Sequence, residues 1–301
     1  MADMLSWAVF FILRRITIFQ LILLGIVSMA NAQDIIPLAE LKPGTKCYGL
    51  SVFRGVDPER FECTILGVVD EVPDWPKGAG FKSIVAQLWG GPLNERNVEI
   101  LKEAGVLSGM SGSPVYTLDG KIIGSVMAHF TGSKTPLAFL MPIEMTLNFH
   151  PLTMSQPNRW LKEGADFKSF IGTAETASLK AGEAFAACEM WGDENDCAGA
   201  TVIMVDPKNH DTVHLTGHSS DNVNKGIVAV PIFKAEVVTS ESNLLSSRKI
   251  FKAIGDPIGT MIFNSPFGGI GKLGVLPKSF GVEVSLYGLF GKAVKSNKYN
   301  L

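Results

Sequence analysis

The apolar residues of this chain come in short runs that are separated by glycine, proline and other turn-forming residues. Short apolar runs bounded by turn residues are typical of β-strands. In the first half of the chain such runs cover residues 46–53, 60–69, 82–89, 111–118 and 121–130. In the second half they cover residues 184–191, 200–206, 211–217, 226–238, 258–264 and 280–288. The pattern predicts a mainly β fold with many strands and a few short helices.

Two segments have the spacing of helices instead. Residues 93–104 place apolar side chains at helical intervals, and Gly105 marks the end of that helix. Residues 141–149 form a second, shorter helical pattern. Between two apolar runs, Asp119-Gly120 is a strong signal for a tight β-hairpin turn.

The strand pattern weakens in the middle of the chain. Residues 151–180 are mixed, and we interpret them as a connecting segment with some helix. This divides the chain into two β-rich halves, 33–150 and 181–301. Residues 73–80 and 207–210 are rich in turn formers and are predicted to be loops.

The N-terminus has the three parts of a secretory signal peptide. Arg14-Arg15 precedes an uncharged apolar stretch, and Ala30-Asn31-Ala32 provides small residues for cleavage after Ala32. The alternative is a membrane anchor, because residues 7–13 add further apolar side chains. The stretch after Arg15 is, however, shorter than the roughly 20 residues that a spanning helix needs. We therefore expect residues 1–32 to be removed, leaving an exported protein, periplasmic or extracellular, without a membrane span.

Export changes the interpretation of the four cysteines, because an oxidising compartment permits disulfides. Cys188 and Cys197 flank a turn-rich tip and would staple one hairpin, whereas Cys47 and Cys63 would join the first two strands. The alternative is buried free thiols. The cysteines and histidines show no zinc-ligand spacing, so no metal site is expected.

Charge and composition narrow the classes of partner. Lysine plus arginine (27) nearly balances aspartate plus glutamate (29), so nothing indicates a nucleic-acid partner. Hydrophobic residues make up 46% of the chain, enough to bury a sizeable core. The sequence leaves the oligomeric state open.

The residues that indicate chemistry lie in Gly109-Met110-Ser111-Gly112-Ser113-Pro114. Glycines around a serine let the chain turn sharply, so that backbone N–H groups can face a developing oxyanion. In the chymotrypsin-like arrangement the donors would be the amides of Gly109 and Ser111. The alternative is an ordinary turn, which glycine and serine also favour. The lipase-type elbow is not matched, because Ser113 occupies its last glycine position.

The segment GVLSGMSGSPVYTLDGKIIGSV at 105–126 resembles the nucleophile region of the SpoIVB-type serine peptidases. Residues 35–69 are similar to the opening of bacterial members, and residues 141–147 to their Thr-Pro-Ile-Glu stretch. Residues 213–237 resemble the segment with the family's Gly-His motif, and residues 254–264 the strand that follows it. The likeness spans most of the chain between about 35 and 284.

The resemblance implies a chymotrypsin-like double β-barrel that acts as an endopeptidase on protein or peptide substrates without a cofactor. It places the nucleophile on Ser111 and the general base on His218. The chain departs from the family pattern in having Ser219 where a proline usually follows Gly-His, and Gly91 near the position of the sporulation members' carboxylate.

The third triad member is therefore unassigned, with Asp206, Asp221 and Asp256 as possible substitutes. Two alternatives stay open. One is a catalytically weak or inactive protein that acts as an envelope binding or scaffold module. The other is an esterase that uses the same serine.

Overall fold

The structure is a computed structural model that describes residues 34–70, 82–130, 132–148, 172–173, 178–220, 225–243, 246–287 and 293–300. The predicted signal peptide, the 73–80 loop and most of the connecting segment lie outside these residues. Residues 35–301 group into one compact unit. The fold is mainly β, as the sequence pattern predicts. Among the described residues, no helix combines the length and the apolar character needed to cross a bilayer.

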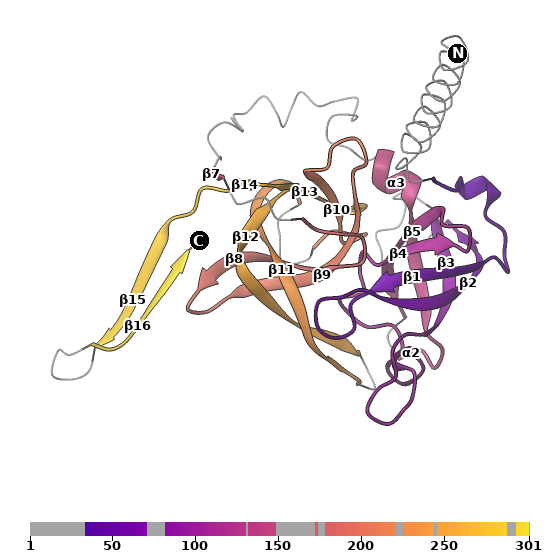
Figure 1. The fold of residues 1–301 in the computed structure, drawn as a ribbon, viewed down its shortest axis with the longest axis horizontal. Coiled ribbons are helices and arrows are strands. Elements are labelled where there is room, and N and C mark those ends of the chain that lie inside the picture. The colour runs from indigo at the N-terminus through magenta and orange to yellow at the C-terminus, as the bar shows by residue number, and fades with distance from the viewer. Residues whose placement is uncertain are drawn as a thin grey trace, which may run out of the picture. The chain divides into compact units, whose positions relative to one another are not determined.

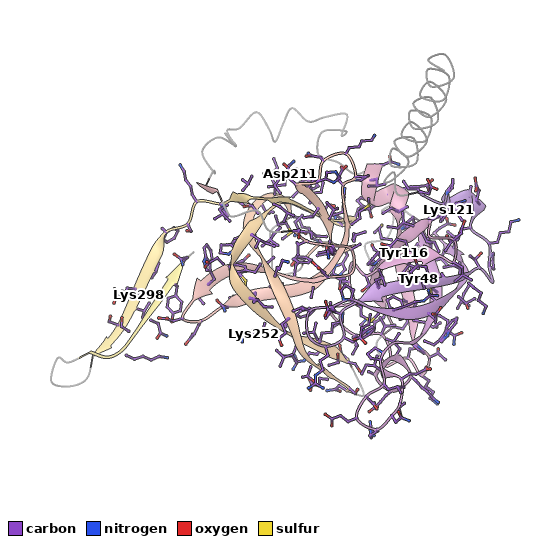
Figure 2. The ribbon with its side chains drawn as sticks, viewed as in Figure 1. Tyr48, Tyr116, Lys121, Asp211, Lys252 and Lys298 are labelled. Atoms are coloured by element: carbon purple, nitrogen blue, oxygen red, sulfur yellow. A yellow bond between two sulfur atoms is a disulfide. The ribbon has the colours of Figure 1, made fainter. Side chains whose placement is uncertain are left out.

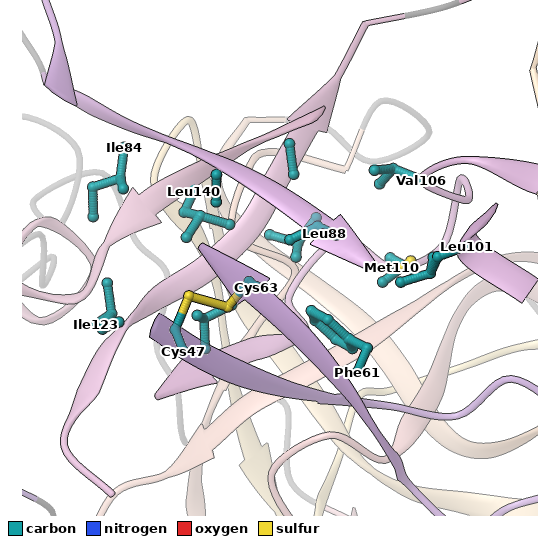
Figure 3. Close-up of a cluster of buried hydrophobic side chains, with 14 of the residues drawn as sticks. Cys47, Phe61, Cys63, Ile84, Leu88, Leu101, Val106, Met110, Ile123 and Leu140 are labelled. Atoms are coloured by element: carbon teal, nitrogen blue, oxygen red, sulfur yellow. A yellow bond between two sulfur atoms is a disulfide. The ribbon is translucent and has the colours of Figure 1, made fainter. Parts of the chain in front are cut away.

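Six antiparallel strands of the first half close into a barrel in the order β1-β2-β3-β6-β5-β4 (Figure 1). They are β1 (Lys46–Ser51), β2 (Glu59–Val69), β3 (Ser83–Gly90), β4 (Pro114–Thr117), β5 (Ile122–His129) and β6 (Leu137–Pro142). Alternate residues of β2 point inward, and Ile65 among them is fully buried. Phe61 of the same face is fully buried with Leu88 and Leu140 (Figure 3). At the seam between β1 and β4, Tyr48 stacks on Tyr116 with ring centroids 5.3 Å apart (Figure 2).

The helices are short. They are the 3₁₀ turn η1 (Leu38–Glu40), α2 (Ile100–Ala104) and α3 (Ile143–Asn148). The prediction of a helix over 93–104 is wrong for its first half. There the side-chain oxygen of Asn94 accepts hydrogen bonds from the backbone N–H of Arg96 and of Val98, at 2.9 and 3.0 Å. These bonds hold a turn that competes with the helix, so α2 begins only at Ile100. Gly105 ends it, as predicted.

The second half forms a larger antiparallel sheet (Figure 1). Its strands are β8 (Ala184–Gly192), β9 (Asp196–Val205), β10 (Thr212–Leu215), β11 (Gly226–Glu241), β12 (Arg248–Ser265), β13 (Gly268–Leu273), β15 (Gly281–Tyr287) and β16 (Ala293–Asn300). The sheet order is β11-β12-β13-β10-β9-β8-β16-β15, and β11 also pairs with β8. The pairings from β8 through β9, β10, β13, β12 and β11 therefore return to β8. A two-stranded sheet joins β7 (Gly172–Thr173) to β14 (Val275–Leu276).

Both predicted cysteine pairs are joined as disulfides. Cys47 lies directly opposite Cys63 between β1 and β2, inside the first core (Figure 3). Cys188 lies opposite Cys197 in the β8–β9 hairpin. The pairing follows from strand register, because directly opposed residues of an antiparallel pair bring their side chains together.

Candidate active site

The segment around Ser111 is built from two consecutive tight turns. The N–H of Met110 donates to the carbonyl of Leu107, and the N–H of Ser113 donates to that of Met110. Gly109 and Gly112 have φ angles of +94° and +90°. These angles favour glycine, because a side chain would clash with its own backbone there.

The predicted nucleophile loop, residues 107–113, packs backbone to backbone against β9. A Cβ at Gly112 would lie 2.0 Å from the carbonyl oxygen of Thr201, so only glycine fits. The N–H of Thr201 donates to the carbonyl of Ser111 at 2.9 Å, and its Oγ1 donates to the carbonyl of Gly109 at 3.0 Å. Thr201 thus fixes the carbonyls on both sides of Met110. These bonds explain how a loop of the first barrel is held against the second sheet.

The predicted general base follows the end of β10. The N–H of Gly217 donates to the carbonyl of Leu215, and Thr216 between them has a φ of +68°. This is a γ-turn of the uncommon, strained type, and such strain clusters at functional sites. Gly217 has a φ of +80°, and a Cβ there would lie 2.8 Å from the carbonyl oxygen of Val126. The glycine therefore lets the histidine loop approach β5, next to the nucleophile loop.

This packing brings the two predicted catalytic side chains together. His218 Nε2 lies 2.7 Å from Ser111 Oγ, and His218 Nδ1 lies 2.6 Å from the carbonyl oxygen of Ser219. A carbonyl oxygen can only accept, so Nδ1 carries the ring proton and Nε2 is the acceptor for the serine hydroxyl. Both side chains are partly exposed, which leaves them open to a substrate.

The acceptor at position 219 is a backbone carbonyl, which serine and proline supply equally. The departure from the family pattern at Ser219 therefore keeps this contact. Of the acids considered as a third member, Asp221 lies outside the described residues and Asp256 is exposed. Asp206 Oδ1 accepts from the backbone N–H groups of Lys208 and Asn209, in the predicted 207–210 turn. The structure therefore leaves the acid unassigned.

The two expected oxyanion donors are available. Within the described part of the chain, the backbone N–H groups of Gly109 and Ser111 donate no hydrogen bond. The carbonyl of Ser108 is held by the N–H of Lys249 at 3.0 Å, and the carbonyl of Met110 by that of Ser113. Because a trans peptide points its N–H opposite to its C=O, these bonds also fix the direction of the two donors.

A buried lysine, which no sequence pattern indicates, lies next to the loop. Lys249 Nζ donates to Ser51 Oγ at 2.7 Å, and Ser51 Oγ lies 2.7 Å from Ser113 Oγ. The Lys249 ammonium also sits 5.4 Å from the centre of the Phe53 ring. Burial disfavours the charged form and lowers the pKa of Lys249 to about 7. In β12, Lys249, Phe251 and Ala253 share the inward face. The exposed residues of the other face include Ile250 and Ile254, so the sequence has no alternation of polar and apolar residues that would mark the lysine as buried.

No group of three or more metal-ligating side chains occurs among the described residues. In comparisons with known proteins, no family model and no curated protein matches the chain. A function for this chain is therefore inferred from its motifs and from the geometry of the site.

Proposed function

We propose that this chain is an exported serine endopeptidase of the SpoIVB type with a chymotrypsin-like double β-barrel. The observation that carries the proposal is the 2.7 Å contact between Ser111 Oγ and His218 Nε2, two residues that are 107 positions apart. The closed first barrel and the ring of strand pairings in the second half support the fold. The Gly-Met-Ser-Gly-Ser-Pro and Gly-His motifs support the family.

Each step of peptide hydrolysis has a group on the chain to perform it. Ser111 Oγ attacks the scissile carbonyl while its proton passes to His218 Nε2. The N–H groups of Gly109 and Ser111 donate to the oxyanion of the tetrahedral intermediate. Ser219 C=O accepts from Nδ1–H throughout, which keeps the imidazolium in place. His218 then gives the proton to the leaving amine, and water releases the acyl group by the reverse route.

The two disulfides support the export part of the proposal, because disulfides persist in oxidising compartments such as the periplasm and the extracellular space. The signal-peptide pattern of residues 1–32 supports the same location. Cleavage after Ala32 would leave both cysteine pairs in the mature chain.

Digestion of an unfolded protein such as reduced casein, followed by mass spectrometry of the peptides, tests the proposal. The mature protein should cut internal peptide bonds, Ser111→Ala should abolish cutting, and His218→Ala should slow it about 10²–10⁴-fold. Ser242→Ala and His210→Ala are matched controls, because both residues are exposed and lie outside the candidate site. Cleavage of esters alone would favour the esterase. Folded wild-type protein that cuts neither would favour the binding or scaffold role.

A further inference from the structure

A cavity of about 480 Å³ opens beside the two catalytic side chains. Ser111 and His218 line it, and its remaining wall comes largely from the second sheet. The apolar part of that wall is formed by Phe185 and Ala187 of β8, Ala198 and Ala200 of β9, and Phe251 and Met261 of β12. We propose that this cavity binds the side chain of the substrate residue whose carbonyl Ser111 attacks, and that it selects a large apolar side chain. This inference rests on the proposed function.

The position of the cavity relative to the nucleophile supports the assignment. A Cβ at Gly109 would lie 2.5 Å from the ring of Phe251, so this ring packs directly on the residue that supplies an oxyanion donor. The same ring covers Gly199 of β9, where a Cβ would lie 2.3 Å away. The apolar wall is thus continuous with the oxyanion loop. A substrate carbonyl held by that loop has its own side chain next to this wall.

The width of the cavity comes from small residues on adjacent strands. Ala187 lies opposite Ala198 in the β8–β9 ladder, and Phe185 lies opposite Ala200. Residues two apart on a strand share a face, so these side chains line one surface. Valine or leucine at the three alanine positions would fill the space that the alanines leave open.

The charges around the cavity argue against charged substrate side chains. Among the described residues that line it there is no carboxylate. A lysine or arginine side chain would be desolvated there without a counter-ion, which is costly. Of the two cations in the wall, Arg248 is paired with Glu241 at 2.8 Å and Lys249 Nζ is bonded to Ser51. Burial lowers the pKa of Lys249 to about 7, so above neutral pH neither basic residue offers an unpaired charge to an acidic side chain, and apolar side chains are favoured.

Peptide anilides that differ only in the residue before the cleaved bond test the selectivity. The values of kcat/KM for leucine and phenylalanine should exceed those for lysine and glutamate by about 100-fold or more, since the charged side chains would have to be buried unpaired. Equal or higher values for lysine or glutamate would overturn the inference.

Ala198→Leu tests the location of the pocket, because Ala198 is partly exposed and the larger side chain can be accommodated without repacking the core. It should lower kcat/KM for the leucine and phenylalanine substrates about tenfold relative to the alanine substrate, since it removes room for the larger side chains. Ala253→Leu is the matched control. Ala253 of β12 is partly exposed like Ala198, but it does not line the cavity. An unchanged ratio in Ala198→Leu would overturn the inference.

A binding measurement tests the pocket independently of peptide hydrolysis. Calorimetry on Ser111→Ala compares product-like peptides that end in leucine with those that end in lysine. Preferential binding of the leucine peptide without hydrolysis by the wild type would support the pocket and defeat the proposed function. Hydrolysis without any preference would defeat the pocket and leave the proposed function standing. Neither hydrolysis nor preferential binding would defeat both.

Discussion

Replacing Lys249 by methionine removes a buried charge that lies next to the nucleophile loop. The two side chains have similar length and volume, so the packing changes little. The Oγ atoms of Ser51 and Ser113 lie 2.7 Å apart, so the two hydroxyls can keep their hydrogen bond to each other in the variant. We therefore expect Lys249→Met to be more stable than the wild type, and the gain to depend on pH.

The direction follows from proton linkage. The pKa of Lys249 is about 7 in the folded protein, below the ordinary lysine value of 10.5 that applies to the unfolded chain. Between these two pKa values the unfolded state binds more protons, so wild-type stability rises with pH through this window. The cost of burying the charge is fully present below about pH 7 and is gone above about pH 10.

The size of the effect follows from the same two pKa values. A lysine pKa that falls from 10.5 to about 7 corresponds to about 5 kcal/mol, since one pKa unit is about 1.4 kcal/mol. Between about pH 9 and about pH 6, the stability advantage of Lys249→Met should grow by about 3 kcal/mol.

Urea unfolding of the two proteins across this pH range measures the effect. Lys252→Met is the matched control, because Lys252 is an exposed lysine of the same strand (Figure 2). The difference in free energy of unfolding between Lys252→Met and the wild type should stay constant across this pH range. A pH-independent difference for Lys249→Met, or one that grows toward alkaline pH, would refute the reasoning.

Four further variants test the packing of the fold and of the candidate site. Gly112→Ala should cost more than about 3 kcal/mol and abolish labelling by a serine-reactive probe, because its Cβ would strike the Thr201 carbonyl. Gly120→Ala, with a φ of +91° but open space around it, should cost only about 1–2 kcal/mol in thermal unfolding. Thr201→Val loses the hydrogen bond to the Gly109 carbonyl and should lower the free energy of unfolding by about 1–3 kcal/mol. Turnover in the anilide assay should also be slower, and unchanged turnover would contradict the role given to Thr201. The double variant Cys188→Ser/Cys197→Ser should have a free energy of unfolding about 3 kcal/mol lower in urea, the value for a disulfide that closes a short loop. A wild type that is equally stable with and without reductant would contradict this disulfide's contribution.

The strands that alternate cleanly could be predicted from the sequence, and β2 is an example. β13 (Gly268–Leu273) was not predicted, because its glycines hide the alternation. Gly271 is buried, and a Cβ there would lie 2.6 Å from the end of the Ile232 side chain of β11, so this position faces the core without an apolar side chain that would mark it in the sequence. The helix over 93–104 was predicted too long because the turn at Asn94 depends on a side chain that bonds its own backbone.

The candidate site was likewise predictable from the sequence only in part. Ser111 was found from its motif and His218 from the family resemblance, since both leave a pattern in the sequence. The carbonyl of Ser219 as the partner of Nδ1 leaves none, because every residue has such a carbonyl. The anchoring role of Thr201 depends on how two distant segments pack, which no local pattern encodes.

Labelling with a fluorophosphonate probe, followed by peptide mapping, tests the activated serine most directly. The mature wild-type protein should carry a single adduct on Ser111, because His218 Nε2 lies within hydrogen-bond reach of that hydroxyl and can take its proton. Ser111→Ala should show no adduct, and His218→Ala should react much more slowly. Folded wild-type protein that stays unlabelled, or that is labelled on another residue, would contradict the proposed enzyme.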